Sequence, residues 1–73
     1  MIRFDVFGRL VGVVRESAGW QAYYLGEEGK RAVARDLTIP PDLPEADLGR
    51  HLADIAHERA SPQRPDVRRL DSV

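Results

Sequence analysis

The chain has 73 residues, a formal net charge of −1, 32% charged residues and no cysteine. The missing cysteines exclude disulfides, thiolate metal sites and thiol nucleophiles, and they fit a reducing compartment. The near-zero charge disfavours non-specific nucleic-acid binding by the whole chain. No apolar run approaches the roughly 20 residues that a membrane-spanning helix needs. We therefore expect a small cytoplasmic protein of bacterial type with no membrane association.

The first 25 residues show the patterns of short strands. Ile2, Phe4 and Val6 alternate with charged residues, which predicts a half-buried strand. Gly8 then indicates a hairpin turn at residues 7–9, or a bulge in one long bent strand. Residues 10–16, rich in valine, and residues 20–25 predict two further strands. Because short turns join the three strands, we expect an antiparallel meander.

Two positions in this region leave alternatives open. Gly12 lies inside the second predicted strand, where a glycine either weakens the strand or lets a bulky neighbour lie against the backbone; Trp20 is the candidate neighbour. Residues 30–39 are compatible with a fourth strand or, over 30–35, with one helical turn. We favour a strand at residues 35–39, which ends at Pro40 and Pro41.

A helix is predicted over residues 42–60, the one long stretch with a helical period. Asp42 and Glu45 are spaced as a capping box, and Pro44 is tolerated in a first turn. The apolar side of this helix is narrow and consists of Leu48, Leu52, Ile55 and Ala56. After residue 60, few apolar residues remain to pack.

These patterns predict an α+β fold, with an antiparallel three- to four-stranded meander and one C-terminal α-helix packed on one face. Residues 1–60 form a single compact β-β-β-(β)-α domain in this prediction, and residues 61–73 form a loosely ordered tail.

One side of the predicted helix is acidic. Asp47, His51, Asp54 and Glu58 share this side, and a histidine with carboxylates can ligate a divalent metal. Charged residues on a helix more often form its solvated side, so we predict no metal or other cofactor and keep these four residues as a weak candidate set.

The opposite side of the helix carries small residues, among them Gly49 and Ala53. A glycine inside a helix costs about 1 kcal/mol relative to alanine, so its presence suggests a close approach of another backbone or side chain. We favour approach to the protein's own sheet over approach to a partner helix.

One helix can cover only one face of the sheet. The second face is then either wet or covered by another chain. By alternation, its apolar residues are Phe7, Leu10, Val14, Tyr23 and Leu25. A contiguous apolar patch of this kind usually marks an interface. With Gly49 and Ala53 they make up the candidate interaction surface, which fits a homodimer or a protein partner. Aromatic residues with arginines nearby leave nucleic acid as the alternative ligand.

Catalysis has little support in the sequence. There is no cysteine, no G-x-S-x-G segment and no phosphate-binding glycine loop, because the loop at residues 26–29 is acidic. No nucleophile accompanies the histidine and carboxylates of the helix. We therefore predict that the chain is not an enzyme and has no catalytic residues.

Three segments carry a resemblance. The chain opens with F-D-x-F-G (residues 4–8), continues with W-x-x-Y-Y-L-G-x-x-G (residues 20–29) and has I-P-x-D (residues 39–42) before the helix. It resembles a family of small uncharacterised bacterial proteins with these segments, which implies no function. Its order of three strands and a helix is similar to the partial RNase H-like fold of HicB antitoxins, which implies an antitoxin-like role. We predict a small non-enzymatic protein-interaction module that self-associates or binds a partner, with a nucleic-acid-binding or antitoxin-like protein as the alternative.

Overall fold

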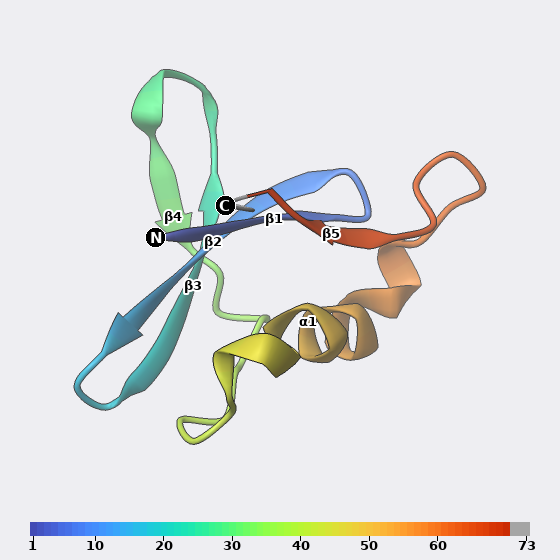
Figure 1. The fold of residues 1–73 in the computed structure, drawn as a ribbon. Helices are drawn as coiled ribbons and strands as arrows, with labels where there is room; N and C mark the ends of the chain where they lie inside the picture. The colour runs from blue at the N-terminus through green and yellow to red at the C-terminus, as the bar shows by residue number, and fades with distance from the viewer. Residues whose placement is uncertain (71–73) are drawn as a thin grey trace.

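A five-stranded antiparallel sheet covered by one helix forms the protein (Figure 1). The computed structural model describes residues 1–70. The strands, in the spatial order β4-β3-β2-β1-β5, are β1 (Ile2–Val6), β2 (Arg9–Glu16), β3 (Gly19–Leu25), β4 (Arg31–Val33) and β5 (Val67–Arg69). The helix α1 spans Leu48–Ala56. The predicted α+β fold is confirmed, with more strands than the sequence suggested.

The β1–β2 connection is a hairpin turn, the first of the two predicted alternatives, and Phe7 and Gly8 are its two central residues. Phe7 and Gly8 both have positive φ, at 51° and 93°, which is the backbone of a type I′ turn and matches the twist of the strands. The side chain of Asp5 accepts a hydrogen bond from the Gly8 amide at 2.7 Å and closes the turn. The register Val6↔Arg9 follows from this turn.

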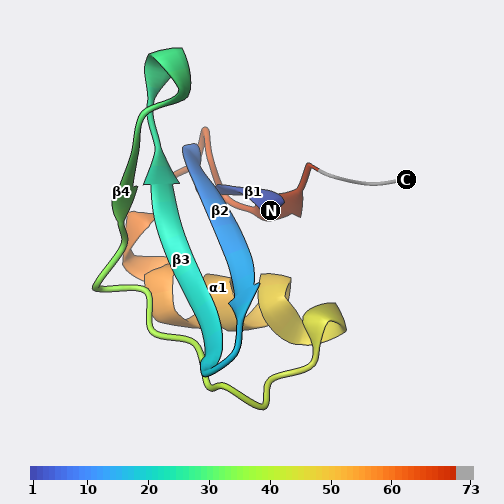
Figure 2. The ribbon, with the colours of Figure 1, turned by 90° about the vertical axis from the view of Figure 1, so that its left-hand side faces the viewer.

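The core lies between the sheet and α1. Figure 2 shows the helix behind the strands, with none of the described segments in front of them. The fully buried large side chains come from both layers and are Phe4, Val6, Val11, Val13, Leu48 and Leu52. The predicted buried side of the helix is correct except at Ile55, which is 38% exposed. The helix contacts the sheet through Leu48, Leu52 and Ala56, an i, i+4 row that leaves Ile55 on its flank.

The fourth strand lies earlier in the chain than predicted. β4 pairs with β3 over Arg31–Val33, whereas residues 35–39 form a turn and an extended connection. Ala34 and Leu37 are 1% and 4% exposed, because the chain turns inward there and inserts both side chains into the core. The apolar alternation that suggested a strand at 35–39 therefore reflects packing of a connection.

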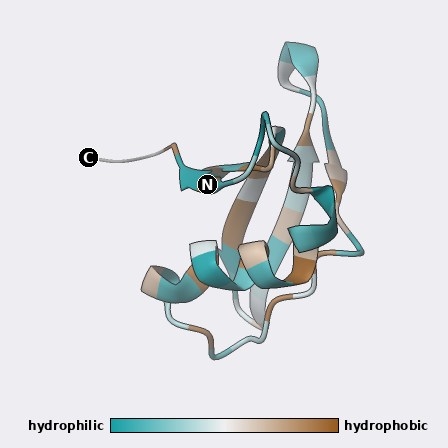
Figure 3. Cartoon of the chain, turned by 90° about the vertical axis from the view of Figure 1, so that its right-hand side faces the viewer, coloured by the Kyte–Doolittle hydropathy of each residue, from teal (hydrophilic) through white to brown (hydrophobic). Residues whose placement is uncertain are grey.

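The helix is shorter than predicted and has no capping box. Short 3₁₀ turns, η2 (Glu45–Asp47) and η3 (His57–Arg59), flank α1, and no side chain caps either η2 or α1. Pro44 is the residue before η2. The entry to the helix is held instead by Trp20, whose indole N–H donates to the Leu43 carbonyl at 2.9 Å. The outer side of the helix is largely hydrophilic (Figure 3).

The chain after residue 60 contains an edge strand. The prediction of a loosely ordered tail is wrong for residues 67–69, which pair with β1 as β5 in the register Val6↔Val67. Backbone hydrogen bonds from Phe7 N to Asp66 O (3.2 Å) and from Leu70 N to Arg3 O (2.8 Å) extend the pairing. Residues 71–73 lie outside the described residues. No helix among the described residues is long and apolar enough to cross a membrane.

Candidate functional site

The face of the sheet that points away from α1 carries a row of apolar side chains that no layer of the described residues 1–70 covers (Figure 2). Residues on this side alternate with the buried residues of the core, which places Leu10 and Val14 of β2 and Tyr23 and Leu25 of β3 there. We call this surface the open face. Its apolar members are Met1, Leu10, Val14, Tyr23, Leu25 and Val33. Met1, Leu10 and Val33 are 49%, 37% and 48% exposed, so a continuous apolar surface meets solvent.

Met1 lies over Gly12 at the centre of the open face. A Cβ at Gly12 would come within 2.9 Å of the Met1 Cγ and 3.2 Å of the Leu25 Cδ1. The expectation that a bulky side chain covers this glycine is therefore correct, but the expected neighbour, Trp20, is wrong. Trp20 lies on the other face, where the Arg15 guanidinium stacks 4.7 Å from the centre of its ring.

Not all residues of the predicted interaction surface lie together. Phe7 is not on the open face, because the hairpin turn packs it against the core. Gly49 and Ala53 belong to α1, on the other side of the sheet. A Cβ at Gly49 would lie 3.6 Å from the Phe4 ring, so the glycine faces the protein's own sheet. The structure brings together Leu10, Val14, Tyr23 and Leu25, whose role in an interface stays a prediction.

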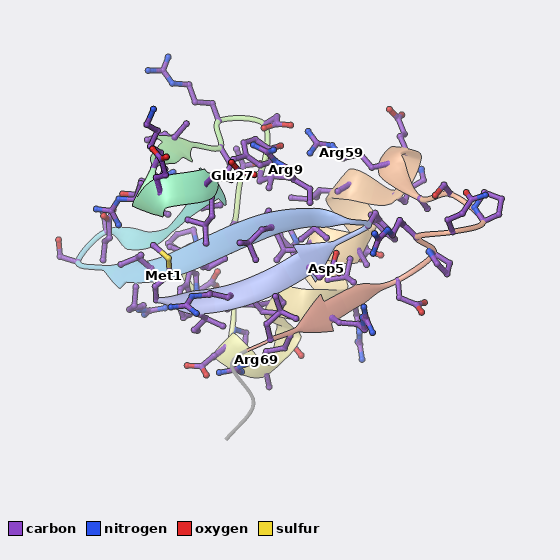
Figure 4. All side chains as sticks on the ribbon, turned by 90° about the horizontal axis from the view of Figure 1, so that it is seen from above. Met1, Asp5, Arg9, Glu27, Arg59 and Arg69 are labelled. Carbon is purple, nitrogen blue, oxygen red and sulfur yellow. The ribbon has the colours of Figure 1, made fainter. Side chains whose placement is uncertain are left out.

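A hollow of about 430 Å³ continues the open face toward the β3–β4 hairpin. Figure 4 shows Met1 beside this hairpin, whose 3₁₀ turn η1 (Glu27–Gly29) carries Glu27. The lining residues are Met1, Arg3, Leu10, Leu25, Gly26, Gly29, Lys30 and Arg31. Aliphatic side chains thus form part of the wall, and three cations form the rest. Among the described residues that line it, none is acidic.

A second hollow of about 310 Å³ lies on the other side of the same hairpin. It is lined by Arg9, Tyr24, Gly26, Lys30, Arg31 and Ala32. Again three cations and, within the described part of the chain, no carboxylate form the lining. The two hollows share Gly26, Lys30 and Arg31, so the hairpin separates two basic depressions. We call them together the basic hairpin hollows.

Each tyrosine of the sheet is stacked by arginine. On the open face, the Arg31 guanidinium lies 4.6 Å from the centre of the Tyr23 ring. On the helix side, Arg9 and Arg59 lie 4.8 Å and 5.0 Å from the centre of the Tyr24 ring. Figure 4 shows Arg9 and Arg59 near one another at this edge of the molecule. Such contacts are worth about 0.5–1 kcal/mol at exposed sites and fix the orientation of the guanidinium groups.

The Tyr24 hydroxyl is the centre of a small polar network. It donates to Asp36, with its oxygen 2.8 Å from Oδ2 and 2.9 Å from Oδ1, and it accepts from Arg59 Nη2 at 2.6 Å. Burial raises the pKa of Tyr24 above 10.0, and the hydrogen bond to Asp36 acts in the same direction. The hydrogen bond from Tyr24 lowers the pKa of the Asp36 carboxyl below 3.8. This network ties β3, the connection after β4 and the end of the helix together.

The weak metal candidates of the helix do not form a site. The described residues contain no group of three or more histidine, aspartate or glutamate side chains placed to hold a metal ion. His51 Nε2 instead donates to the Thr38 carbonyl at 2.7 Å, which holds the connection to the helix. Asp54 and Glu58 are exposed, and Asp47 is half-buried as the residue that precedes α1.

The basic hairpin hollows were not found by sequence reasoning. Their cations come from three segments, namely Arg3 of β1, Arg9 of β2, and Lys30 and Arg31 at the start of β4. Charge counts along the chain do not reveal the cluster, because Glu27 and Glu28 lie just before Lys30 and Arg31 in the sequence and offset their charge. The one available signal was the pair Lys30-Arg31 directly after a glycine turn.

Comparison with known proteins gives one match. A family described as a domain of unknown function, DUF7661, matches residues 1–71. Neither curated proteins nor solved structures gave a match. The family match does not confirm the three sequence segments individually or the similarity to HicB antitoxins, and it gives no indication of catalysis. Its coverage of nearly the whole sequence shows that the chain belongs to the DUF7661 family.

Proposed function

We propose that this protein is a small non-enzymatic protein-interaction module that buries its open face against another protein surface. The observation that carries the proposal is the uncovered aliphatic centre of the sheet, in which Leu10 and Leu25 flank Met1 over Gly12. Removal of apolar surface from water is favourable by about 25 cal/mol per Å². When a partner covers these side chains, the burial of their apolar surface lowers the free energy of the complex. The isolated chain keeps the same surface in contact with water.

A structural role of these residues predicts a different outcome from an interface role. If Leu10 and Leu25 serve the fold, polar replacements lower the free energy of unfolding. If they serve an interface, the replacements leave stability nearly unchanged and reduce association. The 37% exposure of Leu10 supports the second alternative, because a side chain that is already wet loses little packing when it is replaced.

The test combines size and stability. Light scattering and sedimentation over a wide concentration range measure whether the chain forms a homodimer. The variants Leu10→Ser, Leu25→Ser and Tyr23→Glu should weaken association, while Arg50→Glu on the exposed side of α1 is the matched control. The free energy of unfolding in urea, followed by the fluorescence of the single tryptophan, should change by less than about 1 kcal/mol for Leu10→Ser, whose side chain is already exposed. A large loss of stability with unchanged association would contradict the proposal.

The alternative function is nucleic-acid binding, including an antitoxin-like role. Arginines and tyrosines near the hairpin favour it, because base stacking on aromatic rings is a common mode of single-strand recognition. Against it, both tyrosine rings already carry stacked guanidinium groups. Titration with single-stranded DNA and RNA at low salt tests this alternative, since phosphate contacts make binding strongly salt-dependent. A cytoplasmic location and a bacterial source, expected from the sequence, stay predictions.

A further inference from the structure

We infer that the open face and the basic hairpin hollows receive an acidic segment of a partner protein that carries aliphatic side chains among its carboxylates. This inference rests on the proposed function and specifies the chemistry of the partner. Three features carry it: the local excess of cations in the hollows, the aliphatic wall of the larger hollow, and the arginine side chains that already stack on the tyrosine rings nearby.

The charge of the hollows differs from that of the chain. The sequence has 12 acidic and 11 basic side chains, yet each hollow is lined by three cations and, in the part of the chain that the structure describes, by no carboxylate. A concave surface lined by one sign of charge focuses its potential and raises the local concentration of oppositely charged ligands. The occupant of these hollows is therefore anionic.

The aliphatic wall requires that the occupant also has apolar groups. Met1, Leu10 and Leu25 line the larger hollow together with Arg3, Lys30 and Arg31. A ligand with only anionic groups has two ways to bind here. It leaves the aliphatic side chains in contact with water, or it places its charges against them and loses the hydration free energy of those charges. A segment with leucine-like side chains between glutamates or aspartates satisfies both parts of the wall.

The aromatic rings favour a peptide over a nucleic acid. Bases bind single-strand readers by stacking on free ring faces. Here Arg31 covers one face of the half-buried Tyr23, and Arg9 and Arg59 flank Tyr24. A stacked guanidinium group can still donate hydrogen bonds from its edge. Two of its N–H groups can bind both oxygens of one carboxylate.

A second copy of the chain placed face to face fits less well. The ionisable residues on this side of the sheet are Arg3, Asp5, Glu16, Arg31 and Arg68. Asp5 is already engaged, since it accepts from the Gly8 amide and lies 3.5 Å from the Arg68 guanidinium. Because the Asp5 and Arg68 charges offset one another, two such faces would place Arg31 of each copy in the interface with Glu16 as the other carboxylate among the described residues on this side. Like charges across an interface disfavour association.

The chain provides a single reporter for this surface. It has one methionine, so an isotope-labelled methionine methyl group gives one NMR signal, at the centre of the open face. The probe is a synthetic peptide that alternates glutamate and leucine and is capped at both ends. The comparison probes are the same peptide with lysine in place of glutamate and a single-stranded oligo-thymidylate.

We expect the glutamate–leucine peptide to shift the Met1 signal saturably, and the lysine–leucine peptide to leave it unchanged. Arg31→Glu should weaken binding by about tenfold, because it replaces attraction by repulsion at the rim. Lys30→Glu, at an exposed turn position, provides a second charge reversal in case Arg31→Glu disturbs β4. Arg50→Glu, an equal charge reversal on α1, should have no effect.

Other results would overturn the inference. A response to the oligo-thymidylate but not to the acidic peptide would assign the cations to nucleic acid. Equal responses to both peptides, or equal losses in Arg31→Glu and Arg50→Glu, would show that charge in the hollows is not recognised. If the acidic peptide fails while Leu25→Ser still reduces association in the size measurement, the partner chemistry is wrong and the proposed function stands. If Leu25→Ser has no effect there either, both are wrong.

Discussion

The Met1 side chain rests on the backbone of Gly12, with its Cγ 2.9 Å from where a Cβ would be. Any side chain at position 12 would occupy the space that the Met1 side chain fills, so β2 has a glycine here in place of a residue with a higher strand propensity. The contact sets the shape of the aliphatic wall beside the hairpin. A single substitution at Gly12 should therefore move the Met1 side chain.

Gly12→Ala should displace Met1 without unfolding the protein. The added methyl group meets flexible side-chain atoms of Met1 and Leu25, which can move, and alanine removes the entropic penalty of a strand glycine of roughly 0.5–1 kcal/mol. We expect a net change in the free energy of unfolding within about 1 kcal/mol and a clear shift of the Met1 methyl signal. An unchanged signal would show that Met1 does not occupy this position in solution.

Gly49→Ala should stabilise the protein. A Cβ at this position lies 3.6 Å from the Phe4 ring, an ordinary contact distance, and alanine is favoured over glycine in a helix by about 1 kcal/mol. Urea unfolding should show an increase of about 0.5–1 kcal/mol. Gly49→Leu provides the comparison, because a longer side chain must push α1 away from Phe4. Equal effects of the two substitutions would contradict the observed packing.

Tyr24→Phe should destabilise the protein by about 0.5 kcal/mol, at the low end for a hydrogen bond because the network is exposed to water. The substitution removes the hydroxyl between Asp36 and Arg59. Tyr23→Phe is the matched control, since within the described residues the Tyr23 hydroxyl makes no hydrogen bond. Chemical unfolding of both variants measures the difference; equal stabilities would show that the Tyr24 network contributes nothing.

The same network should make stability depend on pH at both extremes. The folded-state pKa of Asp36 is lowered by the hydrogen bond from Tyr24, so its contribution is present above pH 3.8 and is lost as the pH falls through the lowered value. The folded-state pKa of Tyr24 is raised by burial, so its contribution is present below pH 10.0 and is lost as the pH rises through the raised value. Phenolate absorbance should show one tyrosine that ionises late, and Tyr24→Phe should remove it.

Val67→Ala should destabilise the protein by about 1 kcal/mol, because a half-buried valine of β5 that packs against the core loses two methyl groups. Leu70→Ala is the control within the same segment, since Leu70 is 48% exposed, and its effect should be smaller. Hydrogen exchange of the Leu70 amide, which donates to Arg3, should become faster in Val67→Ala. If both substitutions had the same small effect, β5 would not be a stable part of the sheet in solution.

Local pattern accounts for much of the fold. The alternation at Ile2, Phe4 and Val6, the glycine turn and the valines of the second strand predict a hairpin, because each is decided by neighbours in sequence. The spacing of Leu48 and Leu52 likewise predicts which side of the helix is buried. Ile55 shows the limit of this reasoning, since the angle at which a helix docks decides which flank is covered.

Residue patterns alone are enough to predict an antiparallel meander, one helix on one face and an apolar opposite face. Features that depend on residues far apart in the chain follow instead from tertiary contacts. Val67–Arg69 becomes a strand because β1 offers an edge and Glu45 offers an ion pair to Arg69 at 2.8 Å, neither of which is local. Met1 covers Gly12, and Arg3, Arg9, Lys30 and Arg31 converge on one hairpin, because register and strand order place them there. Local secondary-structure propensity thus accounts for most of the strands and the helix. Contacts between segments far apart in the chain form the surface through which we propose that this protein acts.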